Sequence, residues 1–348
     1  MERWQKSLAA SINSLEELTK RFRIDPEPLQ PVAERYPMRI TPYDLSLVQE
    51  IGDPIWRQCV PDPRELENGH LPVDPLNEVA SSPVPGLIHR YPDRVVLLVS
   101  STCATLCRFC MRKSWIHSQA GSNTNNSIEA ALEYIQKTSA IRDVILSGGD
   151  PLLLADEFLE SILARLRKIP HVEIIRVGSR APVTLPNRIT PRLCRMLKRY
   201  HPVYVNTHFN HPLEITPQSK EACARLADAG IPVGNQTVLL KGVNDNLEVM
   251  KELMQKLLTI RVRPYYLHHM DLAKGTHHFR TSVEQGLKIM AGLRGYTSGM
   301  AIPYYVIDPP GGKGKVPILP EDIKRDGHTL YLRNYLGEVI EYPDCPGE

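Results

Sequence analysis

The sequence lacks an uninterrupted apolar stretch near the roughly 20 residues that a membrane-spanning helix needs. Its first residues, Met-Glu-Arg-Trp, also lack the charged and then apolar pattern of a signal peptide, so we expect a cytosolic protein without a membrane partner. Neither sign of charge predominates, because 42 basic and 39 acidic residues give a net charge of +3. No long run of one sign suggests a nucleic-acid track, so nucleic-acid binding is not expected.

Cysteine is scarce, and its count of seven is odd, which argues against a disulfide framework in a reducing compartment. Four of the cysteines are scattered along the chain and are interpreted as buried or incidental thiols: Cys59, Cys194, Cys223 and Cys345. The other three lie within eight residues of one another. A metal site or a catalytic role is therefore expected only for that group.

Apolar and β-branched runs alternate with amphipathic stretches from Arg94 onward, which predicts parallel strands joined by helices. The expected strands are Val95–Val99, Asp143–Ser147, Glu173–Val177, Val203–Thr207, Val233–Leu240 and Pro264–Leu267. The expected helices between them are 127–138, 156–168, 191–200, 217–229 and 247–258. Six such units predict the α/β class and a partial (β/α)6 TIM-like barrel.

The two ends of the chain have a different pattern. Residues 1–88 mix helical stretches with proline-rich connectors and predict a mostly helical extension. Residues 89–300 hold the barrel. Residues 301–348 contain Ile302–Asp308, a glycine-rich loop and a closing hairpin at 330–333 and 338–342, and predict a C-terminal appendage.

The three clustered cysteines, Cys103, Cys107 and Cys110, follow the first expected barrel strand, where barrel sites lie. Three thiolates are one fewer than a tetrahedral zinc ion or a closed [4Fe–4S] cluster uses, so a cluster held here would have one open iron. An open iron can bind a small chelating molecule, which suits a catalytic cluster. The alternative from the spacing alone is a zinc site completed by a distant cysteine or histidine.

Two glycine-rich segments are candidates for ligand binding. The second expected strand ends in Gly148, Gly149 and Asp150, where a backbone without side chains can approach a ligand and a carboxylate can accept from an ammonium. The other segment runs from Asp308 to Pro317 and carries Lys313 and Lys315. It does not satisfy the P-loop pattern, because no serine or threonine follows Lys315. A lysine there could instead form a Schiff base with pyridoxal 5′-phosphate.

The C-x3-C-x2-C spacing directly after a first barrel strand resembles the radical S-adenosylmethionine superfamily, whose open iron is chelated by the amino and carboxylate groups of S-adenosylmethionine. From about His89 to the closing hairpin the chain further resembles the lysine 2,3-aminomutase family. The segments that match in order and spacing are 89–94, 271–275, 278–281, 292–299 and the glycine-rich loop. The resemblance implies three cofactors: a [4Fe–4S] cluster, S-adenosylmethionine and pyridoxal phosphate.

The resemblance also implies roles for individual residues. Lys315 corresponds to the lysine that forms the aldimine with pyridoxal phosphate, and Arg90, Tyr91 and Arg94 fall on the family's phosphate-binding segment. The residues implied near S-adenosylmethionine are Gly148, Gly149, Asp150, His208 and Gln236. Those implied for the amino acid substrate are Arg112 for its carboxylate and Asp271 and Asp308 for the lysine ε-ammonium.

Lysine is therefore the expected substrate, with arginine or ornithine as cationic alternatives. The family also implies an external electron donor of the flavodoxin or ferredoxin type. A cysteine group that binds zinc between subunits in clostridial members is reduced here to Cys345, so we expect a homo-oligomer, a dimer, without that zinc. Two other interpretations stay open: a radical S-adenosylmethionine enzyme that has lost pyridoxal phosphate, and a zinc- or cluster-bearing binding module without catalysis.

Overall fold

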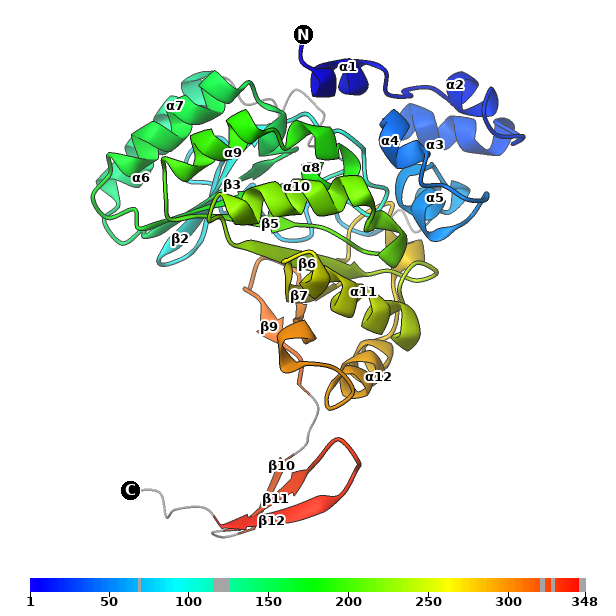
Figure 1. The fold of residues 1–348 in the computed structure, drawn as a ribbon, viewed down its shortest axis with the longest axis vertical. Coiled ribbons are helices and arrows are strands. Elements are labelled where there is room, and N and C mark those ends of the chain that lie inside the picture. The colour runs from blue at the N-terminus through cyan, green and yellow to red at the C-terminus, as the bar shows by residue number, and fades with distance from the viewer. Residues whose placement is uncertain (68–69, 115–124, 320–322, 327–328, 344–348) are drawn as a thin grey trace.

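A curved sheet of nine strands forms the centre of the computed structural model, which describes residues 1–67, 70–114, 125–319, 323–326 and 329–343. The strands lie side by side in chain order (Figure 1). They are β1 (Leu87–Tyr91), β2 (Arg94–Ser100), β3 (Asp143–Gly148), β4 (Ile174–Gly178), β5 (Val203–Thr207), β6 (Val233–Leu239), β7 (Arg263–His269), β8 (Tyr304–Ile307) and β9 (Val316–Pro317).

Strands β2 to β8 are parallel to one another, and β1 and β9 pair antiparallel with β2 and β8 at the two edges. The sheet order begins at β1 and ends at β9, so the barrel is open rather than closed. The six strands expected from the sequence are β2 to β7. The predicted α/β partial barrel is therefore confirmed.

Strand β8 differs from the prediction. The sequence placed Ile302–Asp308 in the C-terminal appendage, with a boundary at 300/301, whereas β8 pairs in parallel with β7. The alternation of strands and helices continues for one more unit through helix α12 (Val283–Leu293), but β8 has only four residues and gives little periodic signal. The lysine-bearing loop thus follows a strand of the central sheet.

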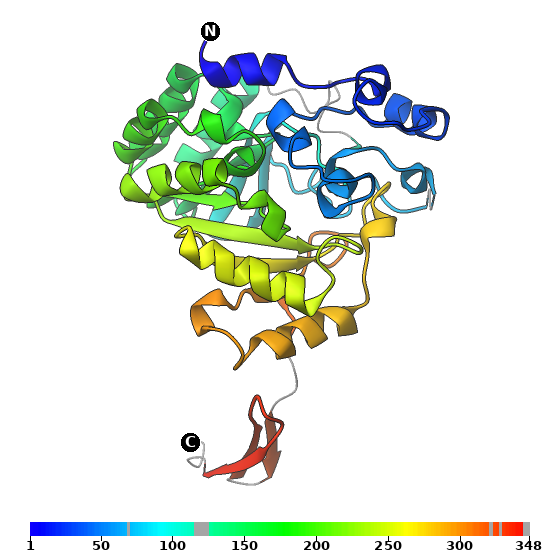
Figure 2. The same ribbon diagram turned by 45° about the vertical axis from the view of Figure 1, so that its right-hand side comes forward.

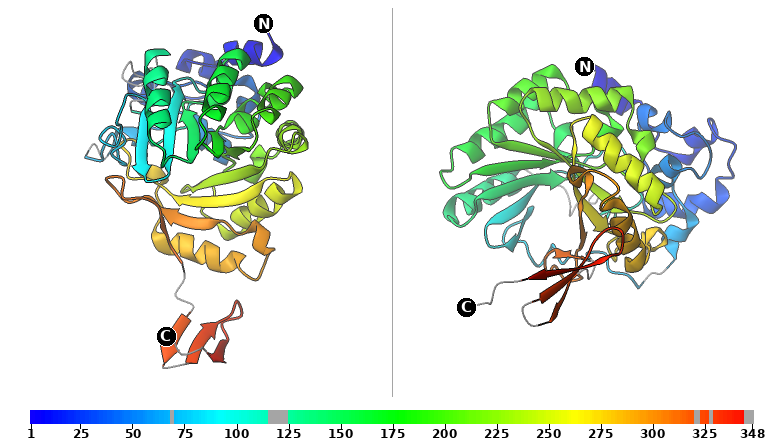
Figure 3. Two further views of the ribbon diagram at one scale, coloured as in Figure 1. Left: turned by 90° about the vertical axis from the view of Figure 1, so that its left-hand side faces the viewer. Right: turned by 60° about the horizontal axis from the view of Figure 1, so that its bottom comes forward.

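Helices cover the outer face of the sheet, as Figure 3 shows most clearly. Thr190 and Thr216 each accept a backbone hydrogen bond at a helix start that continues with proline, which explains why α9 and α10 begin there. Apolar side chains of the helices pack on the sheet in one continuous core. The helices after β2 are α6 (Asn125–Lys137), α7 (Asp156–Arg167), α8 (Ala181–Thr184), α9 (Pro191–Lys198), α10 (Pro217–Asp228), α11 (Leu247–Thr259) and α12.

The N-terminal part is helical and has its own apolar cluster around Leu18, Ile40 and Trp56. It lies beside the barrel in Figures 1 and 2, where it is blue. Its backbone is hydrogen-bonded to the cysteine loop, because Leu106 N donates to Arg39 O and Arg108 N donates to Gln58 O, both at 2.9 Å. Its helices are α1 (Arg3–Ala9), α2 (Leu15–Thr19), α3 (Gln30–Arg35), α4 (Pro42–Leu45) and α5 (Pro54–Cys59).

A second, small sheet ends the described chain and projects away from the barrel (Figures 1 to 3). The expected hairpin corresponds to β11 (Thr329–Arg333) and β12 (Val339–Pro343), and β10 (Ile323–Asp326) adds a third antiparallel strand. The ring of Tyr335 packs edge-on against Tyr296, with centroids 5.5 Å apart. Cys345, which bears on the intersubunit zinc, lies outside the described residues.

Short 3-10 turns connect many of these elements: η1 (Glu27–Leu29), η2 (Pro63–Leu66), η4 (Pro151–Leu153), η5 (Pro186–Arg188), η6 (Pro212–Glu214), η7 (His277–Phe279) and η8 (Gly299–Ala301). Within the described part of the chain, no helix is both long and apolar enough to cross a bilayer.

Candidate active site

The carboxyl ends of the parallel strands bring the predicted residues to one end of the barrel. The cysteine loop follows β2, the Gly148-Gly149-Asp150 segment ends β3, and His208 follows β5. Gln236 lies within β6, Asp271 follows β7, and Asp308 follows β8. The residues that the sequence assigned to the cluster and to the substrate cation therefore lie at one end of the barrel, whereas Gln236 lies within β6 and Arg94 begins β2.

The three cysteines of the loop line one cavity. Cys103, Cys107 and Cys110 share it with Tyr36 and Pro37 of the N-terminal part and with Thr105, Leu106, Arg108 and Lys113. Burial raises the pKa of all three thiols, to about 11 for Cys110. Because a metal must displace these protons, metal binding and thiol ionisation are linked here.

A buried ion cluster fixes the middle of this loop. The carboxylate of Glu65 accepts from Arg108 Nε and NH2 at 2.8 and 2.5 Å, and from Lys113 Nζ at 2.5 Å. Arg108 NH1 also donates to Pro37 O at 3.0 Å. Removing one partner from a buried carboxylate that binds two buried cations destabilises the folded state by several kcal/mol. Because Glu65 belongs to the N-terminal part, the conformation of the cysteine loop depends on that part.

The arrangement of thiols suits a cluster better than a single ion. Among the described residues, no group of three or more histidine, cysteine, aspartate or glutamate side chains is placed to hold one metal ion. A structural zinc site requires four ligands around one centre. In an iron–sulfur cluster each thiolate binds a different iron, so three thiols spread around a cavity fit it.

Gly148 and Gly149 lie against the start of the cysteine loop. A Cβ on Gly148 would come within 2.2 Å of Ser100 O, and one on Gly149 within 2.5 Å of Thr102 O. Gly148 also has a φ of +116°. The backbone is paired here as well, because Gly149 N donates to Ser100 O at 2.6 Å and Asp150 N to Thr102 O at 2.7 Å. The two glycines therefore set the position of the cysteines.

Asp150 is almost fully buried and its carboxylate is already occupied. It accepts from Ser179 Oγ at 2.7 Å, from Arg180 N at 2.9 Å and from Leu152 N at 3.0 Å. This network ties the end of β3 to the end of β4. The structure thus gives Asp150 a structural role, and its predicted contact with an ammonium stays a prediction.

His208 and Gln236 are joined by a side-chain hydrogen bond. Burial, together with the neighbouring His268 and Arg180, lowers the pKa of His208 to about 3. His208 is therefore a neutral imidazole at neutral pH. The structure brings these two residues together, as the resemblance implied, and their role toward a cofactor stays a prediction.

Lys315 is fixed at both its backbone and its amine. Its N–H donates to Tyr91 Oη at 2.8 Å, and its Nζ donates to Asp308 Oδ2 at 2.8 Å. His268 Nδ1 lies 3.6 Å from the same Asp308 oxygen. Burial raises the pKa of Asp308, but the contact with His268 and the charge and hydrogen bond of Lys315 outweigh it and lower the pKa to about 2. Lys313, by contrast, is exposed.

Arg90, Tyr91 and Arg94 gather beside this loop on β1 and β2. Arg90 NH2 donates to Leu76 O at 3.1 Å, whereas its buried Nε has no hydrogen-bond partner among the described residues. The Arg94 guanidinium lies 4.1 Å from the centre of the Tyr91 ring. A buried guanidinium donor without an acceptor, close to a lysine amine, fits a phosphate group attached to an aldehyde cofactor. The residues present therefore fit pyridoxal phosphate.

Two carboxylates and two cations meet at the substrate end of the site. Burial raises the pKa of Asp271 to about 7, and the neighbouring charge of Asp308 raises it as well, while Lys315 and Arg112 oppose this. Asp308 Oδ1 is buried without a hydrogen-bond partner in the described structure. Its nearest cation is Arg90, whose NH1 lies 3.9 Å away, so this oxygen can still accept a hydrogen bond from an incoming ammonium.

Arg112 is already paired in this arrangement. Its Nε and NH2 donate to the buried Glu78 at 2.7 and 2.6 Å, and NH1 reaches Ser147 Oγ at 3.4 Å. A guanidinium carries five N–H donors, so hydrogens on NH1 and NH2 remain for a substrate carboxylate. Glu78 thus orients Arg112, and the remaining N–H groups of the Arg112 guanidinium are left for a ligand.

Three residues of the site were missed by sequence reasoning: Glu78, Arg180 and His268. Arg180 NH1 donates to Cys107 Sγ at 2.9 Å, and His268 contacts Asp308. Both lie at the carboxyl end of a strand, β4 and β7, so the rule that barrel sites lie at these ends, which was applied to the cysteine loop, also pointed to them. Glu78 gave no such signal, because it precedes the barrel strands and lies 34 residues from Arg112 in sequence.

Comparison with known proteins identifies the chain's relatives. Residues 97–254 match the radical SAM superfamily model, and residues 290–347 match the lysine-2,3-aminomutase model. The L-lysine 2,3-aminomutase of Fusobacterium nucleatum is 49% identical over 98% of this chain and 82% of the relative. That of Clostridium subterminale is 50% identical over 98% of this chain and 84% of the relative.

A glutamate 2,3-aminomutase of Clostridioides difficile is also similar, at 45% identity over 99% of this chain and 82% of the relative. The matches therefore span both the barrel and the lysine-bearing loop, and they include relatives named for two different substrates. The chain belongs to the lysine 2,3-aminomutase family of the radical S-adenosylmethionine superfamily.

Proposed function

We propose that the chain is an L-lysine 2,3-aminomutase, an isomerase that moves the α-amino group of L-lysine to the β-carbon and gives β-lysine. The observation that carries this choice is the pair of carboxylates, Asp271 and Asp308, beside the Lys315 amine. Two acidic groups at a partly closed site neutralise a cationic side chain and repel that of glutamate. Relatives named L-lysine 2,3-aminomutase support the same choice.

The family implies a [4Fe–4S] cluster, S-adenosylmethionine and pyridoxal phosphate. When bound, the first two supply a radical that takes a hydrogen atom from the substrate, and the third supplies an electron sink for the migrating amino group. We assign Cys103, Cys107 and Cys110 to the cluster, and Gly148, Gly149, Asp150, His208 and Gln236 to S-adenosylmethionine. We assign Arg90, Tyr91, Arg94 and Lys315 to pyridoxal phosphate, and Arg112, Asp271 and Asp308 to the amino acid.

The contacts of Asp308 suggest how the lysine loop and the substrate share one carboxylate. In the described structure Asp308 Oδ2 accepts from the Lys315 ammonium at 2.8 Å. When Lys315 binds pyridoxal phosphate, Asp308 would lose its hydrogen-bonded ammonium and keep the longer ion pair with Arg90, whose NH1 lies 3.9 Å from Oδ1. A buried carboxylate that is only partly compensated is costly, so the ε-ammonium of the substrate becomes the favoured replacement.

The test is anaerobic incubation of the reconstituted protein with S-adenosylmethionine, pyridoxal phosphate, dithionite and one amino acid from a panel. The panel contains lysine, arginine, ornithine and glutamate, and the readout is formation of the β-amino acid. Lysine should give the highest specificity constant, with arginine and ornithine lower and glutamate inactive. A preference for glutamate would overturn the assignment of Asp271 and Asp308.

A non-catalytic zinc- or cluster-bearing module is the second candidate. Iron, sulfide and zinc analysis after anaerobic reconstitution tests this candidate, because the enzyme should hold four irons, whereas zinc alone would favour the module. The cavity shared by the three cysteines favours the cluster.

We further propose two partners. The first is an external electron donor of the flavodoxin or ferredoxin type, since Pro37 is exposed and lines the same cavity as the three cysteines. The second is another copy of the chain, in a dimer. The six described cysteines are free thiols, which supports the predicted location in the cytosol.

A further inference from the structure

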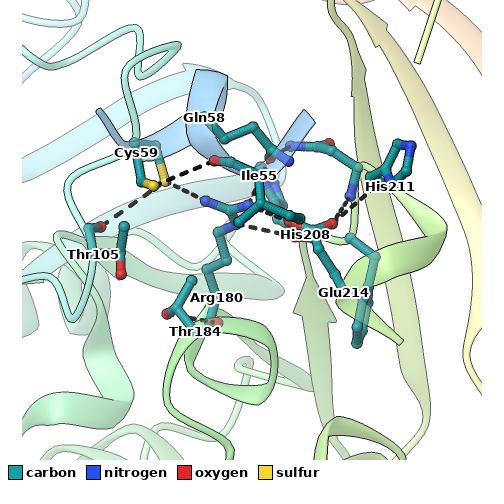
Figure 4. Close-up of polar contacts among 12 residues, drawn as sticks. Ile55, Gln58, Cys59, Thr105, Arg180, Thr184, His208, His211 and Glu214 are labelled. Carbon is teal, nitrogen blue, oxygen red and sulfur yellow. Dashed lines mark hydrogen bonds and ion pairs between the residues drawn. The ribbon is translucent and has the colours of Figure 1, made fainter. Parts of the chain in front are cut away.

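Arg180 is a buried cation whose N–H groups donate hydrogen bonds to four acceptors. Its NH1 donates to Cys107 Sγ at 2.9 Å, and its Nε donates to His208 O at 3.1 Å. Its NH2 donates to Gln58 Oε1 at 2.7 Å and to Glu214 Oε1 at 2.6 Å. Figure 4 shows the guanidinium between Gln58 on one side and His208 and Glu214 on the other.

The groups that hold Arg180 are themselves fixed. The other oxygen of Glu214 accepts from the backbone N–H groups of Asn210 and His211. Gln58 Oε1 also accepts from Asn210 Nδ2 at 3.0 Å, and Gln58 Nε2 donates to Pro54 O at 3.1 Å. The Arg180 side chain is 11% exposed and that of Glu214 only 1%. The guanidinium therefore has little freedom to turn away from the cysteine.

We propose that Arg180 is a positioning residue for the cluster, which donates a charge-assisted N–H···S hydrogen bond to the Cys107 thiolate and thereby raises the reduction potential of the cluster. Hydrogen bonds to the sulfurs and nearby charge are among the factors that set the potential of an iron–sulfur centre. One-electron reduction makes the cluster more negative. A fixed cation at one thiolate stabilises that reduced form more than the oxidised one.

The N-terminal part takes part in this contact through Gln58 of α5. Gln58 orients Arg180 through its side chain and holds the cysteine loop through its carbonyl, which accepts from Arg108 N at 2.9 Å. The potential of the cluster is thus coupled to the docking of a helix that lies outside the barrel. The inference rests on the cluster assignment made under the proposed function, and its test does not require aminomutase turnover.

The first measurement uses the parent protein, reconstituted anaerobically and reduced by dithionite, which supplies the single electron. Arginine labelled with 15N in its guanidinium group is incorporated, and pulsed electron paramagnetic resonance is recorded on the reduced cluster. We expect a 15N coupling that is absent from a labelled Arg180→Lys protein. A normal cluster signal without this coupling overturns the inference alone, whereas a parent that forms no cluster overturns the cluster assignment and the inference with it.

The second measurement is a redox titration of the cluster without S-adenosylmethionine in the parent, Arg180→Lys and Arg180→Gln. The midpoint potential should be lowest for Arg180→Gln, which removes the charge, and intermediate for Arg180→Lys, which keeps it. Arg192→Gln is the matched control, because Arg192 is an exposed arginine on α9, and it should titrate as the parent does. An Arg180→Gln protein with full iron content and the parental potential would refute the role.

Discussion

At the scale of single residues, contacts distinguish Lys315, which we propose reacts with pyridoxal phosphate, from its neighbour Lys313. Lys315 is partly buried, held by Tyr91 and Asp308, whereas Lys313 points out of the same loop. Borohydride reduction of the pyridoxal phosphate-loaded protein, followed by peptide mapping, should place the label on Lys315. Lys313→Ala should keep the label and Lys315→Ala should lose it, and label on Lys313 in the parent would contradict the assignment.

Asp271 gives a second test at this scale. Removing a carboxylate that pairs with a buried cation costs about 3–5 kcal/mol, so Asp271→Asn should lower kcat/KM for lysine roughly a hundredfold or more. Asp271→Asn is a cleaner probe than Asp308→Asn, because Asp308 also holds Lys315. Iron content and pyridoxal phosphate absorbance should equal those of the parent. Unchanged kcat/KM in Asp271→Asn would show that this carboxylate does not bind the substrate cation.

The same carboxylate predicts a pH dependence. Burial and the charge of Asp308 raise the pKa of Asp271 to about 7, so Asp271 is neutral below this pH and ionised above it. Only the ionised form attracts an ammonium, hence kcat/KM for lysine should fall as the pH is lowered through about 7. In Asp271→Asn, kcat/KM for lysine should no longer fall as the pH is lowered through about 7.

Ionisation of Asp271 at rising pH should lower the stability of the protein, although it should raise kcat/KM for lysine. Because the folded pKa of Asp271 exceeds the unfolded value of 3.8, the folded state binds more protons between these values, and the free energy of unfolding falls as the pH rises through that range. Asp271→Asn should therefore unfold at no lower a temperature than the parent at pH 8. A lower Tm there would assign the loss of activity to misfolding.

Sequence reasoning applies best to residues whose type and position in the chain together indicate their chemistry. Cysteines after the first strand, or a lysine in a glycine-rich loop, needed no knowledge of distant contacts. The pairing of Arg112 with Glu78, by contrast, joins a barrel loop to the N-terminal part. Asp150 shows a second limit of sequence reasoning. An aspartate that can bind an ammonium and an aspartate that connects two loops by hydrogen bonds look identical in the sequence.

At the scale of elements, the end of β3 controls the geometry of the cysteine loop. A methyl group on Gly149 would lie 2.5 Å from Thr102 O and 2.7 Å from Thr102 N, both backbone atoms that cannot move without shifting Cys103. Gly149→Ala should therefore destabilise the protein by about 1–3 kcal/mol and reduce the iron bound on reconstitution.

Gly299→Ala is the matched control for this prediction. A Cβ on Gly299 meets no atom within 4 Å, and its backbone does not lie in the left-handed region. Its Tm and iron content should remain those of the parent. If Gly149→Ala binds iron as fully as Gly299→Ala, the close approach of the two loops does not position the cysteines.

The elements most easily predicted were those with long periodic patterns, such as α7 and α11 and the buried strands β2 and β3. Short strands were missed or displaced: β8 has four residues and was placed in the appendage, and β1 has five residues and was not predicted. Their pairing is determined by neighbours that are distant in sequence. Tertiary contacts, rather than local propensity, define these strands.

At the scale of the whole molecule, the N-terminal part and the barrel form one structural unit around the cysteines. Arg39, Gln58, Glu65 and Glu78 all come from the N-terminal part, and each contacts the cysteine loop or a barrel residue of the site. None of these contacts follows from periodicity or motif spacing, since each joins segments more than 30 residues apart. The barrel alone would lack one wall of the cavity that the cysteines line.

The small sheet of β10 to β12 has an apolar face without a covering element among the described residues. On one face its register pairs Leu332 with Ile323 and Ile340, and Leu330 with Tyr342 and Arg325, while Lys324, Tyr331 and Glu341 share the other. Ile323 is 64% exposed and Ile340 49%. A contiguous apolar patch on a projecting sheet is typical of a protein interface, which agrees with the proposed dimer.

Placing a charge on that face should therefore change the oligomeric state. Ile340→Lys puts an ammonium in the middle of the apolar row, and burying it against a second copy without a partner is strongly unfavourable, so the variant should be a monomer where the parent is a dimer. Glu341→Lys is the matched control, because it changes charge on the polar face of the same strand and should leave the dimer intact. Light scattering during size-exclusion chromatography gives both masses. A dimeric Ile340→Lys protein would mean that the two copies associate through another surface, and a monomeric parent would mean that this face is covered by something else.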